Sequence, residues 1–223
     1  MHGHQHEHRS SYVPALGFDW LTPLYDPLLR LLLRERPLKQ RLIEQARIEA
    51  GHAVLDVGCG TGTLAIMVKQ ACPGARVVGL DGDPKILQIA RRKAAAAGLE
   101  IELVEAMAYD PPLPPRSFDR VLSTLVFHHL TVDEKRRTLE GVRALLRPGG
   151  ELHLADFGRP HNLPMKLVGL PLHLHGGGDR MAVHLRGELP ALIEQAGFSN
   201  ARLVSDAMTP FGTLSFFAAS APA

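Results

Sequence analysis

The chain has 223 residues, of which 45% are hydrophobic and 22% charged, enough for one sizeable core and more in keeping with one domain than two. Its formal net charge of +2 is too small to support a nucleic-acid partner. The sequence contains no uninterrupted apolar run of about 18 residues, so it predicts no transmembrane helix. The polar N-terminal residues lack the apolar core of a signal peptide. Cys59 and Cys72 form neither a Cys-x-x-Cys motif nor a disulfide framework, which predicts a reducing, cytoplasmic location.

The N-terminal segment divides into a polar tail and a helical region. Residues 1–11 are rich in histidine and lack periodicity, so we expect them to be disordered. Between residues 12 and 50, apolar residues recur at helical spacing with basic residues between them. Pro37 should divide this region into two helices and lie in the first turn of the second one.

From Ala53 onward, short apolar strands alternate with helices. The predicted strands are 53–57, 75–80, 101–104, 118–124, 151–157, 201–206 and 214–219, and the predicted helices are 61–71, 84–97, 132–146 and 190–196. This order predicts an α/β fold over residues 51–223, a Rossmann-like, doubly wound, mostly parallel sheet with helices on both faces. The turn between the last two strands predicts that the final strand runs antiparallel.

Capping residues mark the ends of two of these helices. Asp83 is a good N-cap and Pro84 suits the first helical position. Thr131 and Glu134 have the spacing of a capping box. The Pro-Gly-Gly sequence at 148–150 should end the helix before the fifth strand.

A glycine-rich turn follows the first strand. In VLDVGCGTG, Asp56 ends the strand, and Gly58, Gly60 and Gly62 lie in the turn that enters the helix. Glycines permit a sharp turn and a close ligand approach at the carboxyl edge of the sheet, where α/β folds bind ligands. The spacing is not the G-x-G-x-x-G of dinucleotide sites, and the carboxylate of Asp56 would repel a pyrophosphate. It suits S-adenosylmethionine, which has an ammonium and a sulfonium and no phosphate; a turn without a ligand is the alternative.

A second acid ends the next strand. Asp81 lies about 20 residues beyond the glycines, where an acid of Rossmann-like folds accepts hydrogen bonds from ribose hydroxyls. Asp83 is better explained as a helix cap. We therefore predict a ligand role for Asp81, with a simple turn residue as the alternative.

Taken together, these residues make the chain resemble class I S-adenosylmethionine-dependent methyltransferases, especially the small-molecule branch of ubiquinone/menaquinone biosynthesis. The resemblance runs from Val54 to Phe157 through VLDVGCGTG, GLDGDP, SFDRVLSTLVFHHL and LRPGGELHLADF, in family order. It implies a cofactor site, with S-adenosylhomocysteine as product, formed by Asp56, Gly58, Gly60, Thr61 and Gly62 at the methionine end, Asp81 and Gly82 at the ribose, Met107 and Ala108 at the adenine, and Thr124 near the sulfonium.

Met107 is a departure from the family pattern. An Asp-Ala pair usually stands where this chain has Met107-Ala108, and its acid receives the adenine amino group. Met107 can cover the adenine face, but its side chain cannot accept that hydrogen bond. A backbone carbonyl, Glu105 or Asp110 would have to accept it instead.

The resemblance also implies a role for the N-terminal helices. In similar enzymes such helices cap the cofactor pocket, which gives a helical cap over residues 12–50 with Tyr25 near the cofactor. Contact with an anionic lipid surface is the alternative for these basic amphipathic helices, so peripheral membrane contact stays open.

Methyl transfer requires no fixed catalytic residue in this class. The protein must align the nucleophile with the methyl group and exclude water, and a base is needed only for an acceptor that carries a proton. His128 and His129 are the candidate bases. The alternative is a loop-stabilising role, which the resemblance favours because the pair recurs in members with different acceptors.

The segment 157–187 has the place of an acceptor-binding insertion. It is irregular and apolar, with Leu170 and Leu172 among its leucines, so it should wall a hydrophobic pocket. His173 and His175 are spaced for a shared metal, but no acid or cysteine completes a site, and we expect none.

The sequence therefore predicts methyl transfer to a small, partly apolar organic acceptor. An NAD-dependent oxidoreductase is disfavoured by the glycine spacing and by Asp56. A nucleic-acid methyltransferase is disfavoured because the fourth strand leads into Ser-Thr-Leu-Val and not Asn/Asp-Pro-Pro-Tyr. A catalytically silent binding protein of the same fold is supported only by Met107. The oligomeric state is left open by the sequence.

Overall fold

The computed structural model describes residues 35–160, 178–210 and 212–222. The helices are α2 (Glu35–Ala46), α3 (Thr63–Ala71), α4 (Pro84–Ala96), α5 (Val132–Leu145), α7 (Gly178–Arg186) and α8 (Leu189–Gln195), with a 3-10 turn η1 (Phe127–His129). The strands are β1 (Ala53–Val57), β2 (Arg76–Asp81), β3 (Glu102–Glu105), β4 (Phe118–Thr124), β5 (Leu146–Phe157), β6 (Ser199–Thr209) and β7 (Gly212–Ser220).

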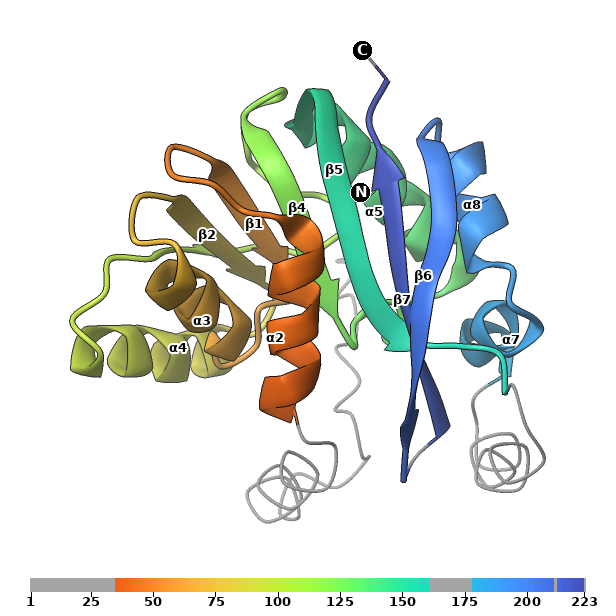
Figure 1. Cartoon of the computed structure of the whole chain (residues 1–223), viewed down its shortest axis with the longest axis horizontal. Coiled ribbons are helices and arrows are strands. Elements are labelled where there is room, and N and C mark those ends of the chain that lie inside the picture. Colours follow the sequence, from red (N-terminus) through yellow and green to blue (C-terminus); the bar gives the residue numbers. More distant parts are fainter. Residues whose placement is uncertain (1–34, 161–177, 211, 223) are drawn as a thin grey trace, which may run out of the picture.

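These strands form one sheet in the order β3-β2-β1-β4-β5-β7-β6 (Figure 1). The pairs from β3 through β5 are parallel, whereas β7 is antiparallel to both β5 and β6. The predicted Rossmann-like, mostly parallel fold with an antiparallel last strand is confirmed. The strand order reverses its direction of growth at β1 and β4, and ligands of open α/β sheets bind outside the carboxyl ends of the strands at such a point.

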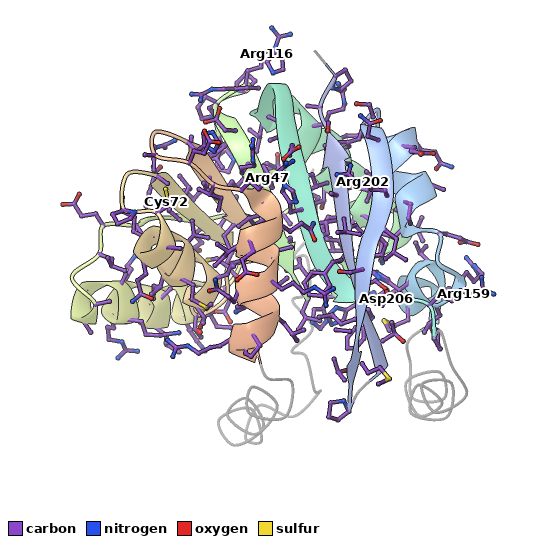
Figure 2. The ribbon with its side chains drawn as sticks, in the orientation of Figure 1. Arg47, Cys72, Arg116, Arg159, Arg202 and Asp206 are labelled. Atoms are coloured by element: carbon purple, nitrogen blue, oxygen red, sulfur yellow. The ribbon has the colours of Figure 1, made fainter. Side chains whose placement is uncertain are left out.

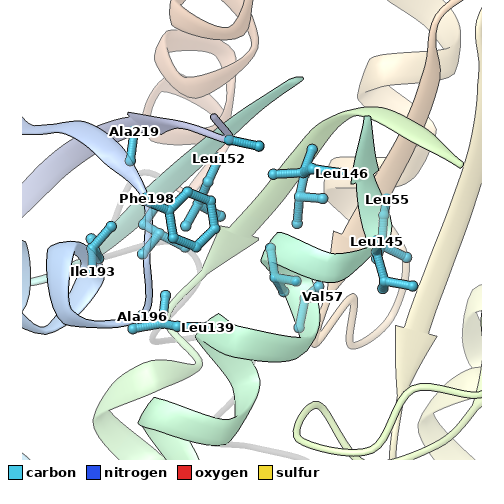
Figure 3. Close-up of a cluster of buried hydrophobic side chains, with 14 of the residues drawn as sticks. Leu55, Val57, Leu139, Leu145, Leu146, Leu152, Ile193, Ala196, Phe198 and Ala219 are labelled. Atoms are coloured by element: carbon cyan, nitrogen blue, oxygen red, sulfur yellow. The ribbon is translucent and has the colours of Figure 1, made fainter. Parts of the chain in front are cut away.

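Helices cover both faces of the sheet, and each face has its own apolar cluster. One cluster joins α5, α7 and α8 to the sheet through side chains such as Leu139, Val183 and Ile193. Figure 3 shows part of this cluster, including Leu139 and Ile193. The other joins α2 and α3 to the opposite face through Leu42 and Leu64. The two layers hold the strands in a fixed register, so the residues at the strand ends keep their relative positions.

The predicted helix caps are present. The Asp83 carboxylate accepts hydrogen bonds from the backbone amides of Lys85 and Ile86, and Pro84 opens α4. Thr131 and Glu134 form the reciprocal hydrogen bonds of a capping box at the start of α5. Both are local patterns that need no tertiary information.

The predicted boundary at Pro148-Gly149-Gly150 is wrong, because these residues belong to β5 and do not separate it from α5. The helix ends at Leu145, and the strand begins at once with Leu146 opposite Phe118. The register then shifts, so that Glu151 lies opposite Arg120 and the Pro-Gly-Gly segment forms an irregularity within the strand. Backbone hydrogen bonds between this segment and Ala221 hold it in the sheet.

Part of the N-terminal prediction lies outside the described residues. The second predicted helix corresponds to α2, which has Pro37 in its first turn. The tail 1–11, the first helix of the proposed cap 12–50 and Tyr25 all lie outside the described ranges. In the part of the chain that the structure describes, no helix is long and apolar enough to cross a bilayer.

We expect Leu139→Ala to lower the free energy of unfolding by about 2–5 kcal/mol, because it leaves a cavity between α5 and the sheet. Leu139 is fully buried in the cluster of Figure 3. The matched control is Val132→Ala in the same helix, where the side chain is 42% exposed and the cost should stay within about 0.5 kcal/mol. Equal losses in urea unfolding would contradict the assignment of Leu139 to the core.

Candidate cofactor and acceptor site

The carboxyl ends of β1, β2 and β4 meet at one edge of the sheet and bring the predicted site residues together. β1 pairs with β2 on one side and with β4 on the other. Asp56 lies near the end of β1, Asp81 ends β2 and Thr124 ends β4. Three side chains from separate parts of the sequence therefore face the same ligand edge.

The loop after β1 has a conformation that requires glycine. Gly58, Gly60 and Gly62 have φ angles of 68°, 55° and 74°, which residues other than glycine rarely adopt. A Cβ atom at Gly58 would also lie 2.2 Å from Cγ2 of Val126, so the loop after β4 approaches its backbone closely. A Cβ at Gly60 would meet no atom within 4 Å, so this backbone borders open space. The φ angles agree with the sharp turn that the sequence predicted, and the close packing of Val126 against Gly58 is a second constraint that it did not predict.

Asp81 ties this loop to the next strand. One of its carboxylate oxygens accepts a hydrogen bond from the Gly60 amide at 2.9 Å, and the other accepts from the Asp83 amide at 3.0 Å. The amides of Gly58 and Cys59 donate to the Leu80 carbonyl at 2.7 and 2.9 Å. Each carboxylate oxygen can accept more than one hydrogen bond, so the carboxylate keeps capacity for ligand hydroxyls. Sequence reasoning missed this tie, for which no local pattern exists.

Asp56 is a buried carboxylate that has no hydrogen-bond partner among the described residues. Its exposed fraction is 1%, and no donor in the described chain has hydrogen-bonding geometry with either oxygen. Burial raises the pKa of Asp56 to about 7, while Lys39 and the nearby amide of Ala65 act in the opposite direction. Buried polar groups are nearly always paired. The unpaired carboxylate fits a ligand with a positively charged group, as the ammonium of S-adenosylmethionine would supply.

Lys39 is a functional candidate that the sequence did not single out. It lies on α2 with an exposed fraction of 8% and pairs with Glu35 one turn earlier. Its charge lowers the pKa of Asp56 across the interface between α2 and β1. Lys39, Glu35 and Thr124 line the same small apolar cavity at the ends of β4 and β5. Only the packing face of α2 distinguishes Lys39 from the other basic residues of that helix.

Cys59 of the glycine loop packs over the sheet and away from solvent. A Cβ atom at Gly79 of β2 would lie 2.9 Å from its Sγ atom, so the sulfur fills the space that this glycine leaves. Burial raises the pKa of the Cys59 thiol, and the charges of Asp56 and Asp81 raise it further. Cys59 and Cys72 are both free thiols.

The predicted adenine position lies next to Asp81. A Cβ atom at Gly82 would be 2.7 Å from Sδ of Met107, so the Met107 side chain lies directly against this glycine and is 38% exposed. Ala108 is partly buried against the core. Glu105 ends β3 opposite Asp81, and it is the nearer of the two alternative acids in the strand register. The Met107 carbonyl accepts a hydrogen bond from the Asp110 amide at 3.0 Å.

The end of β5 carries a second buried carboxylate. Asp156 accepts hydrogen bonds of 2.8 Å from Nδ1 of His128 and from the backbone amides of Phe127 and Phe157. Burial favours its neutral form, but the His128 ring and the Phe157 amide hold the pKa of this carboxyl well below its usual value. His128 is largely buried, whereas its neighbour His129 is exposed. The sequence predicted both histidines as candidates and did not predict their link to Asp156.

The acceptor-side segment is described only at its two ends, and its prediction as irregular is wrong at the second end, where residues 178–186 form helix α7. Arg159 follows β5 at the edge beside α7 (Figure 2). Leu170, Leu172, His173 and His175 lie outside the described residues. Within the described residues, no group of three or more histidine, cysteine or acidic side chains is placed to hold a metal ion. A wider groove of about 550 Å³ lies between α3 and α4, and none of the predicted site residues lines it.

Comparisons with known proteins agree with this geometry. The model of the family described as "Methyltransferase domain" matches residues 54–150. An uncharacterized methyltransferase of Synechocystis sp. is 31% identical over 189 residues, which cover 83% of this chain and 85% of that protein. The demethylmenaquinone methyltransferase of Thermus thermophilus is 40% identical over 145 residues, covering 64% of this chain and 65% of that protein. The structure of a SAM-dependent methyltransferase from Aquifex aeolicus has a TM-score of 0.64 at 21% identity, covering 92% of this chain and 99% of that one.

The chain belongs to the class I S-adenosylmethionine-dependent methyltransferases. Several relatives are named demethylmenaquinone methyltransferases, at 32–40% identity over about two thirds of this chain. The matched region spans just under two thirds of the Thermus relative's length.

We expect the affinity for S-adenosylhomocysteine to rise with pH up to about 7 and then to level off. The ligand ammonium favours ionised Asp56, so binding must displace the proton that Asp56 holds below its pKa of about 7. Linkage gives a slope approaching tenfold per pH unit on the acidic side. Calorimetry between pH 5.5 and 8 measures this slope.

The control is Asp56→Asn, which removes the titrating group and keeps the side chain's shape. This variant should bind S-adenosylhomocysteine more weakly than the wild type at pH 8, and its affinity should no longer rise with pH below about 7. An unchanged slope in Asp56→Asn would show that another group causes the pH dependence.

We expect Met107→Asp to retain the binding of S-adenosylhomocysteine, and to tighten it where the new carboxylate accepts the adenine amino group. The reason is that Met107 already lies at the predicted adenine position against Gly82. Met107→Ala is the control for loss of the side chain alone. A large loss of affinity in a folded Met107→Asp protein would mean that the register across residues 107–108 is wrong.

Proposed function

We propose that this protein transfers a methyl group from S-adenosylmethionine to a small, partly apolar organic acceptor. The observation that carries the proposal is the buried carboxylate of Asp56, which has no hydrogen-bond partner among the described residues and lies beneath a loop whose positive φ angles favour glycine. A carboxylate in that setting needs a cationic ligand. The pyrophosphate of a nicotinamide dinucleotide would be repelled there, so the geometry disfavours the oxidoreductase alternative.

Each predicted cofactor residue has a distinct task in this proposal. Asp56 would bind the ammonium group, and the backbone of the loop at Gly60 and Thr61 would enclose the methionine end. Asp81 would accept the ribose hydroxyls, and Met107 would cover the adenine. The cofactor, when bound, supplies an electrophilic methyl group on a positively charged sulfur.

The chain's own contribution to the reaction is alignment and the exclusion of water. Thr124 and Leu125 close the end of β4 beside α2, where their cavity is apolar and small. We expect the sulfonium near Thr124, with Tyr25 and the rest of the 12–50 cap covering it. The segment 157–187 would provide the apolar wall for the acceptor.

We propose a reduced quinone or a similar hydroxylated aromatic ring as the acceptor. Several relatives are named as demethylmenaquinone methyltransferases, and they are 32–40% identical to this chain over about two thirds of its length. An apolar segment at the ligand edge is compatible with a ring that carries a lipid-like chain. The two free cysteines favour a reducing, cytoplasmic location. The basic residues of α2 are compatible with peripheral contact with the membrane that holds such an acceptor.

The binding test uses Asp81→Ala, which we expect to weaken S-adenosylhomocysteine by about 1–3 kcal/mol, because ligand hydroxyls lose a charged acceptor. Binding also raises the melting temperature of the wild type, since the ligand selects the folded state. The matched control is Asp83→Ala, which removes the cap of α4 but no predicted ligand contact. Equal affinity in wild type and Asp81→Ala would remove Asp81 from the site.

The activity test uses S-adenosylmethionine with a labelled methyl group and a prenylated 1,4-naphthoquinol. We expect label in the quinol product. Binding of S-adenosylhomocysteine without transfer to this quinol would overturn the acceptor, and transfer to no small acceptor would favour the silent binding protein. Failure to bind S-adenosylhomocysteine would overturn the cofactor assignment itself.

A further inference from the structure

The ends of β4 and β5 hold a carboxylate–imidazole pair that cofactor binding does not explain. Asp156 has an exposed fraction of 1%, and the His128 side chain one of 14%. They lie 28 positions apart in the sequence and meet because β5 pairs with β4 in parallel. A buried carboxylate that contacts an imidazole is an arrangement that orients a histidine for proton transfer.

The hydrogen bonds determine which nitrogen of His128 carries the proton. Asp156 is ionised, because its pKa lies well below the usual value, so it accepts and does not donate. Nδ1 of His128, 2.8 Å from the carboxylate, must therefore be the donor. In the neutral ring, Nε2 then has a free lone pair. Among the described residues, Nε2 has no hydrogen-bond partner.

Packing fixes the orientation of the ring. The edge of the His128 ring meets Phe157 with centroids 4.9 Å apart, and the ring lies 3.9 Å from that of His129. The loop that carries it is also held, because the Phe127 amide donates to the second oxygen of Asp156. The ring is therefore positioned before any acceptor arrives.

Charged and titratable groups lie around the His128 ring on each described element that packs against it. They are His129 on η1, Asp156 on β5, Lys135 on α5, and Arg180 and His184 on α7. Burial lowers the pKa of Lys135 to about 8, and its ammonium donates to the carbonyls of Leu130 and Arg180. Burial also lowers the pKa of His184, whose Nδ1 lies 2.9 Å from the Phe157 carbonyl. Asp156 is the nearest negative charge that can stabilise a protonated His128.

We propose that His128 is a catalytic residue, the general base that takes a hydroxyl proton from the acceptor, and that Asp156 is its positioning residue. This inference rests on the proposed methyl transfer and narrows the acceptor to compounds with an ionisable hydroxyl, such as a phenol or a hydroquinone. Neutral amines and thioethers need no such base.

The proton and electron balance is complete without a further reactant. The acceptor O–H bond breaks, its proton bonds to Nε2 of His128, and the oxygen keeps the electron pair. That pair, directly or through the ring to a carbon, forms the bond to the methyl group, and the electrons of the S–C bond remain on sulfur. After methylation at carbon, the displaced ring proton leaves to solvent and the oxygen recovers a proton from His128. The positive charge lost at sulfur is balanced by the proton that is released to solvent.

The opposing explanation is that Asp156 and His128 only hold the η1 turn. The variant that separates the two is His128→Asn, because the asparagine amide can still donate to Asp156 but has no group at the position of Nε2. We expect its kcat to fall by about 10²–10⁴-fold, the usual contribution of a general base, with an unchanged Kd for S-adenosylhomocysteine. His52→Asn, directly before the amino end of β1 and away from the ligand edge, is the control and should change kcat by less than about threefold.

Two further readouts distinguish a base from a structural residue, with the prenylated 1,4-naphthoquinol as the acceptor probe. A quinol with a more acidic hydroxyl should recover activity in His128→Asn. Nitrogen NMR of the ligand-free wild type should show the proton of neutral His128 on Nδ1.

Each failure has its own meaning. A His128→Asn protein that binds S-adenosylhomocysteine normally and keeps full kcat overturns the base while the methyltransferase proposal stands. A proton on Nε2 overturns the base whether or not the probe is methylated. Absence of S-adenosylhomocysteine binding by the wild type overturns the proposed function and does not bear on the tautomer of His128.

Discussion

The attachment of the glycine loop to the end of β2 is the constraint on which the ligand edge depends. Four hydrogen bonds to Leu80 and Asp81 fix the loop and the first turn of α4. Because β2 also pairs with β1 and β3, the loop, the second acid and Met107 form one rigid unit. A loop held by the sheet itself needs little reordering when a ligand binds, so little conformational entropy is lost at that step.

The two buried carboxylates of the site differ in their hydrogen bonding and in the direction of their pKa shifts. Asp56 has no hydrogen-bond partner in the described part of the chain, and burial favours its neutral form. Asp156 has three donors within 2.8 Å, and they keep it ionised although it is just as buried. At Asp156 the charge of the His128 ring and the hydrogen bonds outweigh desolvation, whereas at Asp56 desolvation outweighs the opposing effects of Lys39 and the Ala65 amide. Asp56 is therefore suited to bind a cationic ligand, whereas Asp156 is suited to position the neighbouring His128 side chain.

Sequence reasoning predicted the features that local chemistry determines. The caps at Asp83 and Thr131 follow from side chains that bond to amides two or three residues away, and the glycine loop follows from its spacing after a buried strand. The same reasoning failed at Pro148-Gly149-Gly150, where pairing with β4 and with Ala221 overrides the local preference for a break. It missed the links from Lys39 to Asp56 and from His128 to Asp156, because each depends on which elements the fold brings together.

The placement of the two thiols has a practical consequence for measuring ligand binding. Cys59 is buried against Gly79 in the glycine loop, and burial disfavours its thiolate, the reactive form. Cys72 is partly exposed and follows α3, so it lies at the end of that helix away from the ligand edge (Figure 2). A thiol-reactive fluorophore should therefore label Cys72 selectively in the native protein. Such a probe would be attached at a single defined position, remote from the bound ligand, without any prior cysteine replacement.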